Sequence, residues 1–128
     1  MRVFATKVFT RFAHSERLDD KRLCEAVTRA ERGLIDAELG GGLIKQRVAR
    51  PGGGRSGGYR TVVAFRAARR SVFLYGFAKN ERDNISDREL DDLRKLARLY
   101  LGYSDMQIAN ALQAAELKEV MCDEREKG

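Results

Sequence analysis

The sequence has few of the residues that build metal sites or redox centres. It contains two cysteines, one histidine, one proline and no tryptophan among 128 residues. Cys24 and Cys122 are far apart and form no C-x-x-C pair, so no zinc or iron–sulfur ligand set is expected. We interpret the cysteines as two reduced, buried or incidental thiols. His14 lies in a polar stretch, which favours a solvated surface side chain.

Long apolar runs are also missing. No window of 18 apolar residues occurs, and Arg2 and Lys7 interrupt residues 1–10, so neither a membrane span nor a signal peptide is predicted. A chain of this length, with 43% hydrophobic and 34% charged residues, is typical of one globular domain. We therefore predict a cytoplasmic protein with a single domain over residues 1–128, in which residues 103–128 add a C-terminal helix and tail.

Positive charge is present in excess and is concentrated in one segment. The formal net charge is +6, yet residues 44–82 contain only one acidic residue, Glu81, and the rest of the chain is net negative. Such a concentration of cations attracts polyanions, and we expect RNA as the ligand. The alternative is a solvated strand edge that resists aggregation. The basic residues of the segment are Lys45, Arg47, Arg50, Arg55, Arg60, Arg66, Arg69, Arg70, Lys79 and Arg82.

Hydrophobic periodicity predicts an α+β fold. Apolar residues recur at three- and four-residue steps in the helical segments, whereas from residue 43 the period changes to two. Ile44, Gln46 and Val48 then alternate with Lys45 and Arg47, so the two cations should share one face of a strand. The expected strands are 3–5, 43–49, 59–66 and 71–78, the expected helices are 7–13, 19–33, 86–102 and 104–120, and segments 34–42, 51–58 and 67–70 are expected as connector, loop and turn.

The glycine-rich segment 52–57 formally satisfies G-x-G-x-x-G. A dinucleotide fingerprint opens a helix, however, whereas this segment opens a strand, and no Gly-Lys-Ser/Thr follows to make a P-loop. We interpret it as a flexible basic flap that lets Arg50 and Arg55 adjust to a ligand backbone. The other interpretation is an unconstrained hairpin loop.

Several cations should converge on one site. Lys45 and Arg47 share a face, Arg60 begins one neighbouring strand, and Lys79 ends another. Guanidinium groups bind two phosphate oxygens at once, and a lysine crowded by other cations can release its proton and act as a base. This set is sufficient for RNA cleavage by the adjacent 2′-hydroxyl, and we expect neither a metal nor another cofactor.

Three segments resemble a known family. The sequences Leu-Ile-Lys-Gln-Arg-Val at 43–48, Gly-Tyr-Arg at 58–60 and Phe-Leu-Tyr-Gly-Phe-Ala-Lys-Asn-Glu-Arg-Asp-Asn-Ile at 73–85 resemble the RelE/HigB toxins of type II toxin–antitoxin systems, over roughly residues 1–101. The resemblance implies the α+β RelE-like fold, an antiparallel sheet with N-terminal and C-terminal helices. It also implies a ribosome-associated mRNA interferase, an endoribonuclease that inhibits translation and that a cognate antitoxin silences.

The resemblance also implies roles for individual residues. Lys45 and Arg47 match the basic pair on the family's second strand, one of which is thought to act as the base, and Arg60 matches the arginine that stabilises phosphate. We therefore expect Lys45, Arg47, Arg60 and Lys79 to be catalytic, and Arg50, Arg55, Tyr59 and Arg82 to bind RNA.

Two positions depart from the family pattern. The family's best-studied members have an arginine after the lysine that Lys79 matches, and here that residue is Asn80. They also carry a tyrosine or histidine where this chain has Ser86. The missing aromatic could be replaced by one of the four tyrosines of the chain, Tyr59, Tyr75, Tyr100 and Tyr103.

The departures leave two alternatives to the nuclease. One is a ParE-like relative that poisons DNA gyrase by binding, and the other is a non-catalytic RNA-binding regulatory module. The amphipathic segment Ser104–Val120 is the element we expect to dock the antitoxin; otherwise it packs on its own domain.

Overall fold

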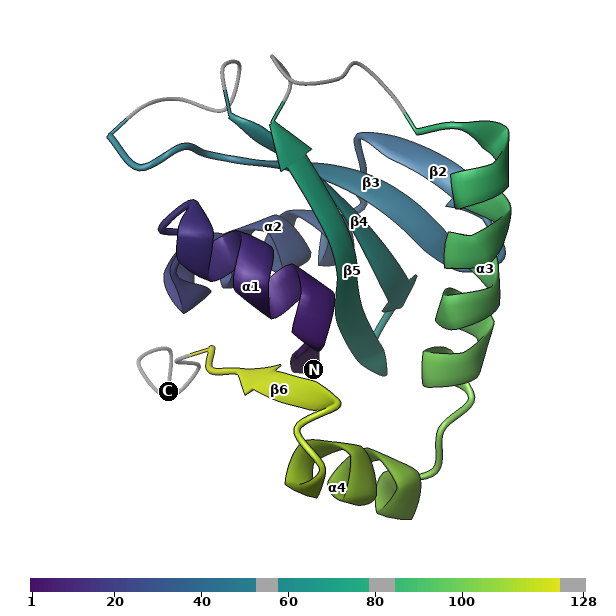
Figure 1. The fold of residues 1–128 in the computed structure, drawn as a ribbon. Helices are drawn as coiled ribbons and strands as arrows, with labels where there is room; N and C mark the ends of the chain where they lie inside the picture. The colour runs from purple at the N-terminus through teal and green to yellow at the C-terminus, as the bar shows by residue number, and fades with distance from the viewer. Residues whose placement is uncertain (53–57, 79–84, 123–128) are drawn as a thin grey trace.

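A computed structural model describes residues 1–52, 58–78 and 85–122, which form one six-stranded sheet and the helices that cover it (Figure 1). In chain order the elements are β1 (Arg2–Thr6), α1 (Lys7–Ser15), α2 (Asp20–Glu31), β2 (Ala37–Gly40), β3 (Leu43–Val48), β4 (Tyr59–Arg66), β5 (Arg70–Ala78), α3 (Asp87–Leu101), α4 (Asp105–Gln113) and β6 (Leu117–Val120).

The sheet has the strand order β2-β3-β4-β5-β1-β6. Only β1 and β5 pair in parallel; the other neighbours are antiparallel. Each face carries its own hydrophobic core: Phe9, Leu23 and Phe73 belong to the core beneath α1 and α2, and Phe4, Leu93 and Ile108 belong to the core beneath α3 and α4. The predicted α+β fold is confirmed.

Side-chain caps fix where the helices begin. Asp19 accepts a hydrogen bond from the backbone N–H of Arg22 at the start of α2. Ser86 and Ser104 each form a capping box at the start of α3 and α4, at the residues where the helices 86–102 and 104–120 were expected to begin. Of the helices that the structure describes, none combines the length and hydropathy needed to cross a membrane.

The predicted connector 34–42 contains a strand, so that prediction was wrong. Ala37–Gly40 pairs antiparallel with β3. Gly40, Gly41 and Gly42 turn the chain between the two strands at φ angles of 87°, 65° and 83°. The glycines that suggested irregular structure instead allow the tight hairpin, because they occupy the left-handed region without steric cost.

The predicted helix 104–120 was also wrong beyond residue 113. Ala115 adopts a φ of 61° after α4, and Leu117–Val120 then forms β6 along the free edge of β1. Ile108 and Ala111 of α4 are buried in the second core. The segment that we expected to dock a partner therefore packs on its own domain.

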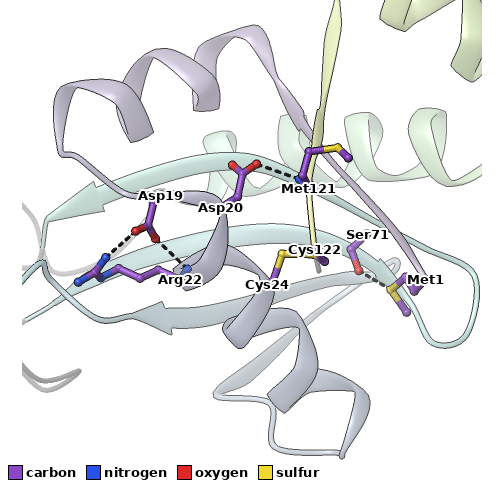
Figure 2. The surroundings of a disulfide bond; sticks show 8 residues. All are labelled: Met1, Asp19, Asp20, Arg22, Cys24, Ser71, Met121 and Cys122. Carbon is purple, nitrogen blue, oxygen red and sulfur yellow. Dashed lines mark hydrogen bonds and ion pairs between the residues drawn. A yellow bond between two sulfur atoms is a disulfide. The ribbon is translucent and has the colours of Figure 1, made fainter. Parts of the chain in front are cut away.

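The two cysteines form a disulfide, so the prediction of reduced thiols was wrong. Cys24 on α2 and Cys122 just after β6 are 98 residues apart in sequence, but their Cα atoms are only 5.7 Å apart (Figure 2). Next to the bond, the backbone N–H of Met121 donates a hydrogen bond to Asp20 at 2.9 Å. The strand β6, which the sequence did not reveal, brings Cys122 to α2.

Candidate polyanion-binding site

Strand register brings the predicted cations of β3 and β4 together. Arg47 pairs with Arg60, which pairs with Phe77 on β5. One step along the sheet, Lys45 pairs with Val62, which pairs with Tyr75. These two cross-strand rows form what we call the cationic face.

The cationic face lies on the α3 side of the sheet. The residues that alternate with Lys45 and Arg47 point the other way: Gln46 donates a hydrogen bond to the carbonyl of Ala26 in α2, and Ile44 belongs to the core beneath α1 and α2. Because strand side chains alternate between faces, both cations project toward the α3 side. The predicted strand pattern is therefore observed.

Arg60 has a guanidinium nitrogen that is buried without a hydrogen-bond partner among the described residues. This nitrogen is Nη1, and the side chain as a whole is partly buried. A buried N–H group without an acceptor costs free energy that a bound acceptor recovers. The guanidinium of Arg60 can therefore donate hydrogen bonds to an oxyanion, which can accept two of them at once.

Arg47 differs from Arg60 because a carboxylate lies beside it. Asp36 accepts hydrogen bonds from the backbone N–H of Arg47 at 2.7 Å and from its guanidinium at 3.4 Å. Arg29 of α2 donates to the backbone carbonyl of Arg47 and lies 3.8 Å from Asp36. Asp36 therefore holds the end of β3 and partly neutralises one of the three cations, a role that residue spacing alone does not predict.

Tyr59, a predicted RNA-binding residue, lies on the opposite face of the sheet. Its ring packs against Phe12 with 5.6 Å between centroids, and its hydroxyl group donates to Glu16 at 2.7 Å. Phe12 can lie this close to the sheet because Gly76 has no side chain beneath it. Arg50 extends over the same Tyr59 ring, 5.7 Å from its centroid, so the structure does not bring Tyr59 and Arg50 to the cationic face.

Among the tyrosines, Tyr75 alone lies in the rows of the cationic face. Its ring is partly buried and its centroid is 6.0 Å from that of Phe77. Tyr100 and Tyr103 instead donate their hydroxyl hydrogens to Glu116, at 3.1 and 3.2 Å.

The remaining predicted positions divide into two groups. Ser86, the position that departs from the family pattern, accepts a hydrogen bond from the backbone N–H of Glu89 and caps α3. Arg55, Lys79, Asn80 and Arg82 lie outside the described residues.

The fold and the cationic face define a small α+β protein whose sheet carries two arginines and a lysine on its α3 side. The chain matches the family described as the RelE toxin of the RelE / RelB toxin-antitoxin system over residues 1–120. It therefore belongs to the RelE toxin family and is a toxin of a toxin–antitoxin system, with an antitoxin as its implied partner. No curated protein matches the chain.

Proposed function

We propose that this toxin is a ribosome-associated endoribonuclease that cleaves mRNA and thereby inhibits translation until its antitoxin binds. The observation that carries the proposal is the guanidinium of Arg60, which lies in register with Arg47 and whose buried Nη1 atom has no hydrogen-bond partner in the described part of the chain. A phosphate group placed there would receive the hydrogen bonds that this structure does not use. Membership of the RelE toxin family supports the same activity.

The reaction needs only the RNA and side chains of this chain. A base removes the proton of a 2′-hydroxyl group, and the oxygen attacks the neighbouring phosphorus. The bond from phosphorus to the 5′-oxygen then breaks as an acid protonates that oxygen, which leaves a 2′,3′-cyclic phosphate and a 5′-hydroxyl end. Cations that bind the phosphate more tightly as its negative charge grows accelerate this step.

The chemistry of the side chains assigns different roles to the three cations. Arginine does not lose its proton in proteins, so Arg60 and Arg47 serve as fixed positive charges on the phosphate oxygens. Lysine can exchange a proton, and we assign the proton transfer from the 2′-hydroxyl to Lys45. Tyr75, in the same row as Lys45, is our candidate for stacking on a base of the substrate.

Cleavage of mRNA on translating ribosomes by purified toxin tests the proposal. We expect new 5′-hydroxyl ends in the parent reaction, unchanged by EDTA, and a loss of about 100-fold or more in rate for Lys45→Ala and Arg60→Ala. Lys21→Ala, an exposed cation on α2, is the matched control and should cleave like the parent.

The proposal fails if the parent leaves the mRNA intact, or if Lys45→Ala and Arg60→Ala both cleave like the parent. Breaks in DNA that depend on gyrase would then identify a ParE-like toxin. RNA binding that weakens with salt but produces no cleavage would identify the regulatory module.

A further inference from the structure

A second group of arginines lies at the other end of the β4–β5 hairpin from Arg60. Arg2, Arg66, Arg69 and Arg70 line a recess of about 100 Å³ together with Asp105 and Leu101. Four guanidinium groups thus share a small space, and the cationic face does not include any of them. We call this the arginine recess.

Two of these arginines are held by the fold. Arg70 is partly buried and donates hydrogen bonds from one nitrogen to the carbonyls of Tyr100 and Tyr103, at 2.8 and 2.9 Å. Arg2 pairs through two nitrogens with the carboxylate of Glu119, at 2.9 and 3.0 Å. Both side chains therefore form a wall of the recess, and apart from the ion pair of Arg70 with Asp105 no described residue accepts from their remaining N–H groups.

Arg66 and Arg69 form the open side of the recess. Both are exposed, and neither forms an ion pair with a carboxylate among residues 1–52, 58–78 and 85–122. They flank a tight turn in which Arg69 donates its N–H to the carbonyl of Arg66, and Ala68 has a φ of 63°. A residue other than glycine in this region is strained, so the turn holds the two side chains together at a conformational cost.

The charges in the recess are not balanced. Asp105, the carboxylate that lines the recess, lies 3.8 Å from Arg70, and Glu119 outside the lining pairs with Arg2. Burial lowers the pKa of Arg70, and repulsion by Arg69, Arg2 and Arg66 lowers it further against the opposing effect of Asp105. A tetrahedral oxyanion in the recess would relieve that repulsion and would fit the forked donors of the arginines.

We propose that the arginine recess binds a phosphate group of the same RNA strand whose reactive phosphate lies at Arg60. This proposal rests on the proposed function. Arg60 and Arg66 are the second and last residues of β4, and a strand of that length places the two sites roughly 20 Å apart. The recess thus extends the contact with RNA beyond the nucleotides that react, and it would strengthen binding without changing the chemistry.

Binding of an RNA that cannot be cleaved tests the inference. The probe is a 2′-O-methyl oligonucleotide of about 12 nucleotides, long enough to reach both sites, and its affinity is measured by fluorescence anisotropy over a series of salt concentrations. For Arg66→Ala/Arg69→Ala we expect weaker binding and a salt slope (log Kd against log salt) that is lower by about 0.7 to 1.4. Arg66→Lys/Arg69→Lys should recover most of the slope but only part of the affinity.

Lys21→Ala/Arg32→Ala removes the same charge from the far side of the sheet and should change the slope little. The inference is overturned if this control loses as much slope as Arg66→Ala/Arg69→Ala, or if the latter binds like the parent. Cleavage on ribosomes, measured separately, shows whether the proposed function itself has failed.

Discussion

Arg47 and Arg60 face each other across β3 and β4, yet among the residues that the structure describes a carboxylate lies beside Arg47 and none lies beside Arg60. Asp36 partly neutralises the guanidinium of Arg47, whereas the guanidinium of Arg60 keeps its charge for a ligand. This asymmetry explains why we assign the phosphate to Arg60 and leads to the first prediction.

Replacing Asp36 should increase affinity for RNA at a small cost in stability. In Asp36→Asn the amide oxygen can still accept from the backbone N–H of Arg47, but the negative charge is gone. We expect tighter binding of the 2′-O-methyl RNA, with a salt slope higher by about 0.7, and a free energy of unfolding lower by about 0.5 to 1 kcal/mol. Glu31→Gln, an equal charge change on an exposed residue at the end of α2, is the control. Equal slopes for the two variants would contradict the prediction.

Reduction of the disulfide should destabilise the fold without removing the cationic face. The bond between Cys24 and Cys122 joins residues 98 apart, and a crosslink of that span contributes about 2 to 5 kcal/mol. Urea denaturation with and without a phosphine reductant measures the loss. Cys24→Ser/Cys122→Ser should match the reduced protein and should not respond to the reductant, whereas RNA binding in native buffer should stay unchanged in all samples.

Alkaline pH should weaken the fold through Tyr100. Burial, followed by its hydrogen bond to Glu116, raises the pKa of Tyr100 to about 12. Because an unfolded tyrosine has a pKa of about 10, the folded state favours the protonated hydroxyl, and this stabilisation is complete below pH 10 and is lost as the pH rises toward 12.

Absorbance at alkaline pH and urea denaturation measure this effect together. The alkaline ionisation of Tyr100 should be the same in the parent and in a variant that lacks Tyr75. Tyr100→Phe should flatten the fall in unfolding free energy across that pH range. An equally steep fall in Tyr100→Phe would show that other groups cause it.

A methyl group at Gly76 should destabilise the protein by about 1 to 3 kcal/mol. An ideal Cβ there would lie 2.5 Å from a ring carbon of Phe12, so the ring would have to move. Thermal denaturation of Gly76→Ala, Phe12→Leu and the double variant forms a cycle that isolates this contact. The double variant should be more stable than the sum of the single effects predicts. Additive effects would show that the loss of stability in Gly76→Ala does not come from the contact with Phe12.

The sequence was sufficient for elements whose pattern is local. Alternation identifies β3, β-branched and aromatic residues identify β4, and Ser86 with Glu89 three residues later identifies the start of α3, because neighbouring residues alone determine those signals. The sequence did not reveal β2 and β6. These four-residue strands exist because an edge of β3 or β1 is free to pair with them, which is a tertiary cause.

The candidate site was predictable to a similar extent. Alternation placed Lys45 and Arg47 on one face, and the register then added Arg60. The role of Asp36 and the position of Tyr59 on the opposite face depend on how α2 and α1 pack, which residue spacing does not encode. The disulfide was missed for the same reason.

The position of β1 determines when this protein can assemble. The strand precedes both of its partners in the sequence: they are β5, which ends at Ala78, and β6, which ends at Val120. During synthesis β1 therefore stays without its sheet partners until the chain has grown past β5 and then past β6, and pairing of such distant segments is slow. The six-stranded sheet can be completed only after β6 has been synthesised.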